Sequence, residues 1–200
     1  MRTVSMTRAL TYSVVAAIAA TVSPAQAATI FTTSLLGSNE SPPVVSTGAG
    51  IGELMLADDM NSFSVLINFS GLGSNAVAGH VHCCTATGSN TGVAIGFTVP
   101  RATAGTIMGT NDLTMTSTYT GAFLLASGGT AAGARARFLG GLSDGLAYLN
   151  VHTVLNPGGE IRGQLGAVPE AETWAMMLIG FGMLGAAMRY GRKNVAISFA

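Results

Sequence analysis

The sequence predicts an all-β domain, an antiparallel β-sandwich or barrel of about eight strands, flanked by an N-terminal signal peptide and a C-terminal transmembrane helix. Three observations lead to this prediction. Short stretches of β-forming residues recur between turn residues, charged residues make up only 9% of the chain, and its 27 glycines suit tight turns. Scarce charge beside abundant Gly, Thr, Ser and Ala is more typical of an extracellular β-protein than of a helical enzyme.

The first element is a signal peptide over residues 1–27. Arg2 and Arg8 give it a basic start, an apolar stretch follows over 9–22, and Ala-Gln-Ala at 25–27 forms a small-residue cleavage site. An uncleaved membrane anchor is the alternative, but the apolar stretch is short for a span. We therefore expect signal peptidase to cleave the chain here, after its export through the inner membrane.

Residues 28–167 remain as one domain, which is long enough to bury its own core. Within it, segments 51–56 and 62–70 flank the polar turn Ala-Asp-Asp-Met-Asn and so predict a hairpin. Apolar side chains at alternate positions of the second segment predict a strand with one buried face. The Ala-rich segment 130–142 is the predicted helix. The predicted strands are 29–36, 51–56, 62–70, 76–83, 92–99, 105–115, 146–153 and 160–165.

The charge of this domain excludes several classes of function. It carries four arginines, no lysine and seven acidic residues, a net charge of −3. Nucleic-acid binding needs clustered Lys or Arg to neutralise phosphates, so no nucleic-acid partner is expected. The sequence also lacks a Gly-x-Ser-x-Gly elbow, a phosphate-cradling loop and a dinucleotide fingerprint. We therefore expect a protein that is not an enzyme.

The stretch 79–90, GHVHCCTATGSN, holds the residues with the most chemistry. His80 and His82 share a face if this segment is a strand, because side chains two apart point the same way. His152 on another strand can supply a third imidazole, and three histidines suit zinc or copper. The same His-x-His device occurs in copper-zinc superoxide dismutases, which are also β-sandwiches. A polar interior satisfied by hydrogen bonds is the competing interpretation.

Cys83 and Cys84 are neighbours in the chain. Free thiols are less expected in an exported protein, because its compartment is oxidising. Intermolecular bridges, a disulfide between the two neighbours that stiffens a turn, and a thiol that joins the metal site all remain open. If the strand continued, Cys84 would share a face with His80 and His82.

The last two predicted strands, 146–153 and 160–165, each carry a row of polar side chains on one face. Gly158 and Gly159 permit a tight turn that brings these strands together. We interpret the rows as a hydrogen-bonded ladder that fixes strand register, with a binding site as the alternative. The rows are Tyr148, Asn150 and His152 on one strand and Glu160, Arg162 and Gln164 on the other.

Residues 168–193 form the C-terminal signal, and residues 194–200 a short tail. The segment 173–188 is predicted as a transmembrane helix, although its uncharged run, which starts at Trp174, spans only about 23 Å against a hydrocarbon core of about 30 Å. A buried core helix fits less well, because the segment has no polar face. The basic residues that should stay cytoplasmic are Arg189, Arg192 and Lys193.

Three blocks of the domain, the last of them in two parts, resemble the CHRD domain, a module first named in chordin and common in bacterial exported proteins. The blocks cover residues 30–166 in the family's order. The resemblance implies an all-β domain and little about chemistry, and chordin's binding of growth factors does not transfer to a bacterial surface protein. The blocks are LGSNESPP at 36–43, GHVH at 79–82, AYLNVHT at 147–153 and PGGEIRGQL at 157–165.

The C-terminus closely resembles the PEP-CTERM sorting signal of Gram-negative bacteria. The matching parts are Val168-Pro169-Glu170, Thr173-Trp174-Ala175-Met176-Met177, Gly180-Phe181-Gly182 and the basic end. The resemblance implies a membrane-anchored precursor and processing by an exosortase, a membrane transpeptidase-like enzyme.

Two functions follow from these observations. The first is a non-enzymatic protein of the cell surface or extracellular matrix, associated with exopolysaccharide, whose processing partners are signal peptidase and exosortase at the membrane. The second is an extracellular domain that binds zinc or copper, with possible redox activity, through His80, His82 and His152.

Overall fold

A computed structural model describes residues 29–168 and 171–191 of the chain. The predicted signal peptide over 1–27 and the tail over 194–200 lie outside these residues. So do four residues of the sorting signal, which are Pro169, Glu170, Arg192 and Lys193.

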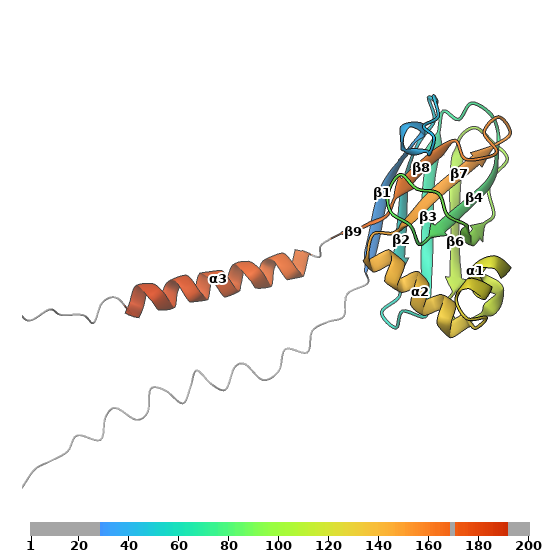
Figure 1. The fold of residues 1–200 in the computed structure, drawn as a ribbon. Helices are drawn as coiled ribbons and strands as arrows, with labels where there is room; N and C mark the ends of the chain where they lie inside the picture. Colours follow the sequence, from blue (N-terminus) through green and yellow to red (C-terminus); the bar gives the residue numbers. More distant parts are fainter. Residues whose placement is uncertain (1–28, 169–170, 192–200) are drawn as a thin grey trace, which may run out of the picture.

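The described domain is an antiparallel, nearly closed barrel of eight strands, which confirms the predicted all-β fold (Figure 1). The strands follow one another around the barrel in the order β5-β4-β7-β8-β1-β2-β3-β6, and the two-residue strand β9 (Gly166–Ala167) pairs with β1. The bounds of the other strands are β1 Ile30–Leu36, β2 Ala49–Leu56, β3 Ser62–Ser70, β4 Ala76–Cys83, β5 Val93–Phe97, β6 Gly105–Asp112, β7 Ala147–Thr153 and β8 Ile161–Gln164.

The alternating pattern of β3 explains how the barrel closes around one core. Its apolar side chains from Phe63 to Phe69 are buried at every second position, while the side chains between them face outward. β3 pairs with β2 in the predicted hairpin and with β6 on its other side. β7 pairs with β8 through the predicted turn at Gly158 and Gly159.

Two helices cover one end of the barrel (Figure 1). The helix predicted over 130–142 is α2 (Ala131–Ser143), with Thr130 as its N-cap. Its Phe138 is fully buried, and the ring lies 5.6 Å from that of Phe63. The second helix, α1 (Gly121–Ala126), was not predicted, because six residues are too few to show a helical period.

The outer face of β4, β7 and β8 is polar, yet it is buried because two loops lie over it. The loop after β1 begins with the 3-10 helix η1 (Gly37–Asn39), and its Glu40 accepts a hydrogen bond from Asn150 of β7. The loop between β4 and β5 receives a hydrogen bond from Arg162 of β8 through Ser89 O. The barrel thus has a second, polar interior outside its apolar core.

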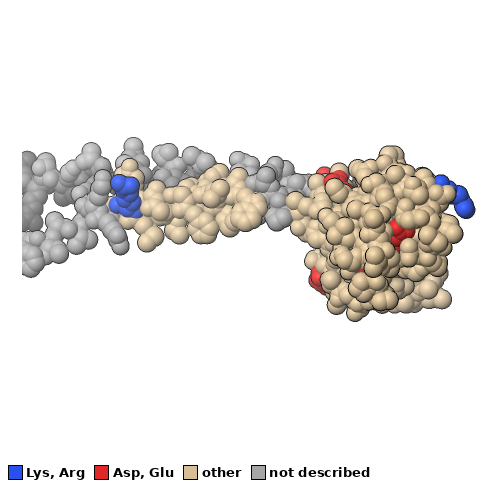
Figure 2. All heavy atoms as spheres, turned by 90° about the horizontal axis from the view of Figure 1, so that it is seen from above, with Lys and Arg blue, Asp and Glu red and all other residues tan. Residues whose placement is uncertain are grey.

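The predicted C-terminal helix forms as α3 (Ala171–Gly191), with Arg189 in its last turn, where Figure 2 shows a basic end. In the described part of the chain, however, no helix is long and apolar enough to cross a membrane. This finding differs from the transmembrane helix predicted over 173–188. The uncharged run is short, and Gly180, Gly182 and Gly185 lower its mean hydropathy.

Candidate metal centre

The three histidines of the chain lie together on the polar outer face of β4 and β7. His80 and His82 alternate along β4, and His152 lies diagonally across the strand pair from His80, since it pairs with Ala78. One ring nitrogen of each histidine lies within 4.8 Å of those of the other two. His80 Nδ1 and His152 Nε2 are only 3.1 Å apart. The residues singled out as metal ligands from the sequence are therefore neighbours in the structure.

Backbone carbonyls orient two of the imidazoles. His82 Nδ1 lies 2.8 Å from Thr91 O, and His152 Nδ1 lies 2.9 Å from Pro157 O. A carbonyl oxygen only accepts, so both Nδ1 atoms carry the proton and both Nε2 atoms present a lone pair. Metal-binding histidines commonly donate their second ring nitrogen to a carbonyl in this way.

The environment favours the neutral form of all three rings. Burial is the main cause that lowers the pKa of His80 to about 4, and His152 and His82 lower it further. Burial also lowers the pKa of His82 and of His152, against the hydrogen bonds from their rings to Thr91 and Pro157. Since a metal binds the neutral imidazole, the cluster is ready to act as a ligand set at neutral pH.

One ring nitrogen of the three histidines has no hydrogen-bond partner among the described residues. His82 Nε2 is buried without a hydrogen-bond partner, and the whole side chain is only 8% exposed. An unsatisfied buried polar atom is costly, so such an atom in a native structure calls for an explanation. A bound ion would be one such partner, and Asn150 Oδ1 and Gln164 Oε1 are buried without a hydrogen-bond partner among the described residues as well.

The spacing of the nitrogens suits a tetrahedral ion. Bonds of about 2.0–2.1 Å place two ligand nitrogens of zinc about 3.3 Å apart. The His80–His152 separation of 3.1 Å already matches this value, while the largest separation in the cluster, 4.8 Å, has to shrink by about 1.5 Å. In the described state His80 Nδ1 donates its proton to His152 Nε2 across this short gap, so an ion bound there would require His80 to carry its proton on Nε2 instead.

Tyr148 and Arg162 extend the cluster into a stack. The Tyr148 ring lies parallel to that of His82, with centroids 4.6 Å apart, and the Arg162 guanidinium lies 3.4 Å from the Tyr148 centroid. Arg162 is 2% exposed and also donates to Ser89 O and Asn90 Oδ1. Arg162 thereby ties the loop that provides the Thr91 carbonyl to the sheet beneath it.

Asn150, the middle residue of the predicted polar row on β7, links the outer face of that strand to Glu40. Its Nδ2 donates to Glu40 Oε1 at 2.8 Å, and Glu40 is 7% exposed. Burial raises the pKa of Glu40 to about 7, although the Asn150 hydrogen bond and the charge of Arg162 act against this rise. Glu40 is therefore a carboxyl group that titrates near neutral pH.

We predict that Glu40→Gln flattens the pH dependence of stability. The raised pKa means that Glu40 stabilises the fold fully below its unfolded pKa of 4.5, and that this contribution is lost as the pH rises towards 7. Relative to the wild type, the variant should gain up to about 3 kcal/mol of unfolding free energy between pH 4.5 and pH 8. Urea denaturation with a chelator present measures the difference. Parallel pH profiles for the two proteins would contradict the assignment.

Glu160 and Arg162, placed in one polar row by the sequence, bind different partners. Glu160 is fully buried and accepts hydrogen bonds from Ser46 Oγ, Gly73 N and Thr153 Oγ1 at 2.6–2.7 Å. Burial by itself raises the pKa of Glu160, but these hydrogen bonds together hold it below its usual value. Glu160 thus anchors the loops at the end of β7, whereas Arg162 anchors the loop over the histidines.

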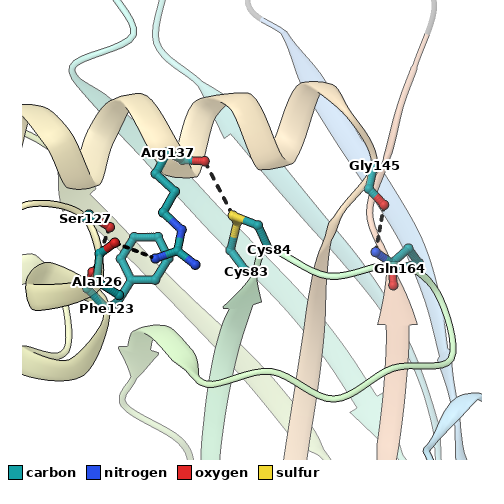
Figure 3. Close-up of a disulfide and its surroundings, with 8 residues drawn as sticks. All are labelled: Cys83, Cys84, Phe123, Ala126, Ser127, Arg137, Gly145 and Gln164. Carbon is teal, nitrogen blue, oxygen red and sulfur yellow. Dashed lines mark hydrogen bonds between the residues drawn. A yellow bond between two sulfur atoms is a disulfide. The ribbon is translucent and has the colours of Figure 1, made fainter.

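The two cysteines form a disulfide with each other, one of the alternatives that the sequence left open. β4 ends at Cys83, so Cys84 does not continue the strand face of His80 and His82. Figure 3 shows the disulfide under α2, where Cys84 Sγ lies 3.4 Å from Arg137 O. Gly141 of α2 allows this packing, because a Cβ there would lie 2.2 Å from Cys83 Sγ. The disulfide therefore packs the end of β4, the strand that carries two histidines, against α2.

The described parts of the sorting signal lie beyond the barrel. Val168 N donates to Ile30 O at 2.8 Å, so the first residue of the signal is still hydrogen-bonded to β1. Trp174 on α3 is 52% exposed.

Comparison with known proteins agrees with this architecture. A family model described as the CHRD domain matches residues 31–165, and one described as the PEP-CTERM protein-sorting motif matches residues 167–193. No curated protein and no solved structure matches the chain. The sorting motif implies export, a membrane-anchored precursor and processing by exosortase at the membrane. Since the first model covers most of the chain, the chain belongs to the CHRD domain family and ends in a PEP-CTERM sorting motif.

Proposed function

We propose that this protein is delivered to the cell surface or the extracellular polysaccharide matrix, where its CHRD domain acts as a metal-binding module without enzymatic activity. The metal is zinc or copper, and the ligands are His80, His82 and His152. Both metals accept imidazole nitrogens, and three of them form a ligand set known for each.

The orientation of the rings carries this proposal. Thr91 O and Pro157 O accept the Nδ1 protons of His82 and His152, so the lone pair of each ring is on Nε2, and His152 Nε2 lies 3.1 Å from His80 Nδ1. The buried Nε2 of His82 has no hydrogen-bond partner among the described residues. Hydrogen bonding alone leaves this atom unsatisfied, whereas a metal ion satisfies it.

Glu160 is unsuited to catalysis. A general base must lie within reach of the reacting proton and be free to accept it. Glu160 is engaged by three donors on the other side of the turn from the histidines.

Metal content tests the activity. We predict that the purified protein, reconstituted with zinc or copper and dialysed, retains about one ion per chain, while the double variant His80→Ala/His82→Ala retains little. Thr91→Ala is the matched control, because Thr91 contributes its backbone carbonyl and not its side chain. Substoichiometric metal in both the wild type and the control would refute the metal site.

Cell fractionation tests the destination. In a strain without exosortase, we expect the protein to keep its C-terminal segment and to accumulate in the membrane fraction. In the parent strain a shorter form should appear at the surface or in the matrix. An unchanged size and location after the deletion would contradict exosortase-dependent delivery.

A further inference from the structure

A polar groove lies between the two loops that cover the outer face of β8. The loop after β1 lines it on one side and the loop between β4 and β5 on the other, and Thr33 of β1 and Gln164 of β8 line it from the sheet. Its volume of about 570 Å³ falls in the range of about 300–1,000 Å³ that ligand sites have. None of the three histidines lines it, so the groove is separate from the candidate metal centre.

Hydrogen bonds between its walls hold the groove in shape. Ser41 Oγ donates to Gly88 O at 2.8 Å, and Asn90 Nδ2 donates to Ser41 O at 2.6 Å, so the two loops are tied to each other. Asn39 Nδ2 donates to Arg162 O at 3.1 Å and ties the first loop to β8. A ligand that enters such a preformed groove has few protein groups to order, and this lowers the cost of binding.

The groove offers no unopposed charge to a ligand. Its two charged lining residues, Glu40 and Arg162, have opposite signs, and the charge of Arg162 acts on Glu40. Arg162 also donates from both terminal nitrogens, to Asn90 Oδ1 and to Ser89 O. Since long-range attraction of an ion requires net charge at the site, the groove favours a neutral ligand.

Several polar groups of the groove are free to bond to a ligand. The hydroxyl groups of Ser38 and Thr87 lie on opposite walls, and neither forms a hydrogen bond with the described residues. Asn150 donates to Oε1 of Glu40, whereas Oε2 has no donor among the described residues. A hydroxyl group both donates and accepts, and so does a protonated carboxyl group. The best match for such a lining is a ligand whose own polar groups do both, as sugar hydroxyl groups do.

A peptide matches the groove less well. Extended peptides are recognised through pockets that take side chains at alternate positions. Among the lining residues of the described chain, Pro43 alone has an apolar side chain. The Pro43 ring and the methyl groups of Thr33 and Thr87 offer only small apolar areas, which suit the CH groups of a sugar ring rather than whole side chains.

We infer that this groove binds a neutral saccharide, whose hydroxyl groups bond to Ser38, Thr87 and the free oxygen of Glu40. The inference does not depend on the metal site. It goes beyond delivery to the cell surface or matrix, because it gives the domain a ligand of its own at a site that none of the histidines forms.

The test uses the full-length protein in a detergent without a sugar headgroup, with a chelator present so that metal plays no part. The probes are cellohexaose, laminarihexaose and mannohexaose, followed by saturation-transfer NMR. We expect at least one of them to bind with a dissociation constant below about 1 mM. Ser38→Trp and Thr87→Trp fill the groove from opposite walls, and each should weaken this binding at least about ten-fold.

Val45→Trp is the matched control. Val45 follows Ser38 in the same loop, its side chain is fully exposed, and it does not line the groove, so this variant should bind like the wild type. Melting curves identify the variants that fold, and either groove-filling variant suffices for the comparison.

Three results would overturn the inference. The first is no binding of any probe up to about 10 mM. The second is wild-type binding by a folded groove-filling variant, which would place the saccharide elsewhere on the protein. The third is equal binding of a neutral hexapeptide of glycine and serine, which would assign the groove to peptide backbones. None of these results bears on metal retention, so the metal site stands or falls separately.

Discussion

Replacing Glu160 by alanine is expected to lower the free energy of unfolding by about 3–5 kcal/mol, one of the two largest effects predicted for this domain. The carboxylate is fully buried and accepts hydrogen bonds from Ser46, Gly73 and Thr153. Its removal leaves the buried Thr153 hydroxyl and the part-buried hydrogen bonds of Ser46 and Gly73 without their acceptor, and each buried unsatisfied donor costs about 1–3 kcal/mol. Urea denaturation at neutral pH measures the loss.

Glu160→Gln is the matched variant for this prediction. Its carbonyl oxygen still accepts from Ser46 and Gly73, while the Thr153 hydroxyl can turn to accept from the new amide. We expect this variant to lose less than half as much stability as the alanine variant. An alanine variant within about 1 kcal/mol of the wild type would show that the three donors find water and that Glu160 is not an anchor.

Arg162→Ala is expected to reduce both stability and metal affinity. The side chain is buried, stacks on Tyr148 and donates to Ser89 and Asn90. Its loss removes the stacking on the Tyr148 ring and the hydrogen bonds that hold the exposed Ser89 and Asn90, and should cost about 2–3 kcal/mol. Because the freed loop also carries the Thr91 carbonyl that orients His82, zinc affinity should fall by about 10–100-fold.

Arg162→Lys separates charge from geometry in this prediction. Lysine keeps the positive charge but has neither the planar fork that reaches two loop residues nor the flat group that stacks on Tyr148. We expect it to behave more like alanine than like arginine when zinc binding is followed by calorimetry. Wild-type zinc affinity in Arg162→Ala would mean that the loop does not orient His82.

The positions of the strands and the shared face of His80 and His82 could be predicted from the sequence because both depend on local periodicity. Alternation along 62–70 indicated the buried face of β3, and the His-x-His spacing placed His80 and His82 on one side of β4. His152 was predicted as a third ligand from a second strand, but its place beside His80 depends on the register between β4 and β7. These features need no knowledge of how loops fold.

The surroundings of the cluster could not be predicted, because they come from loops and backbone atoms. The carbonyls of Thr91 and Pro157 carry no side-chain signal, and Glu40 reaches Asn150 from a loop 110 residues away in sequence. Glu160 and Arg162 also anchor different loops, and this difference depends on which loop lies over which strand. Long-range contacts of this kind are fixed by tertiary packing rather than by periodicity.

The membrane prediction shows a different limit. The basic flank and the uncharged run of 173–188 suggested a span, but a span also requires sufficient apolar length. The described helix α3 does not meet that requirement. The family resemblance of this segment to the sorting motif was the more specific evidence, and that resemblance is confirmed.

X-ray absorption at the zinc edge of the reconstituted protein tests the metal site most directly. We predict a first shell of four light atoms at about 2.0–2.1 Å, with the outer-shell scattering of three imidazole rings. The spectrum of His82→Ala should lose one of these rings or lack bound zinc. A six-coordinate shell of oxygen atoms without imidazole scattering in the wild type would contradict a metal centre formed by His80, His82 and His152.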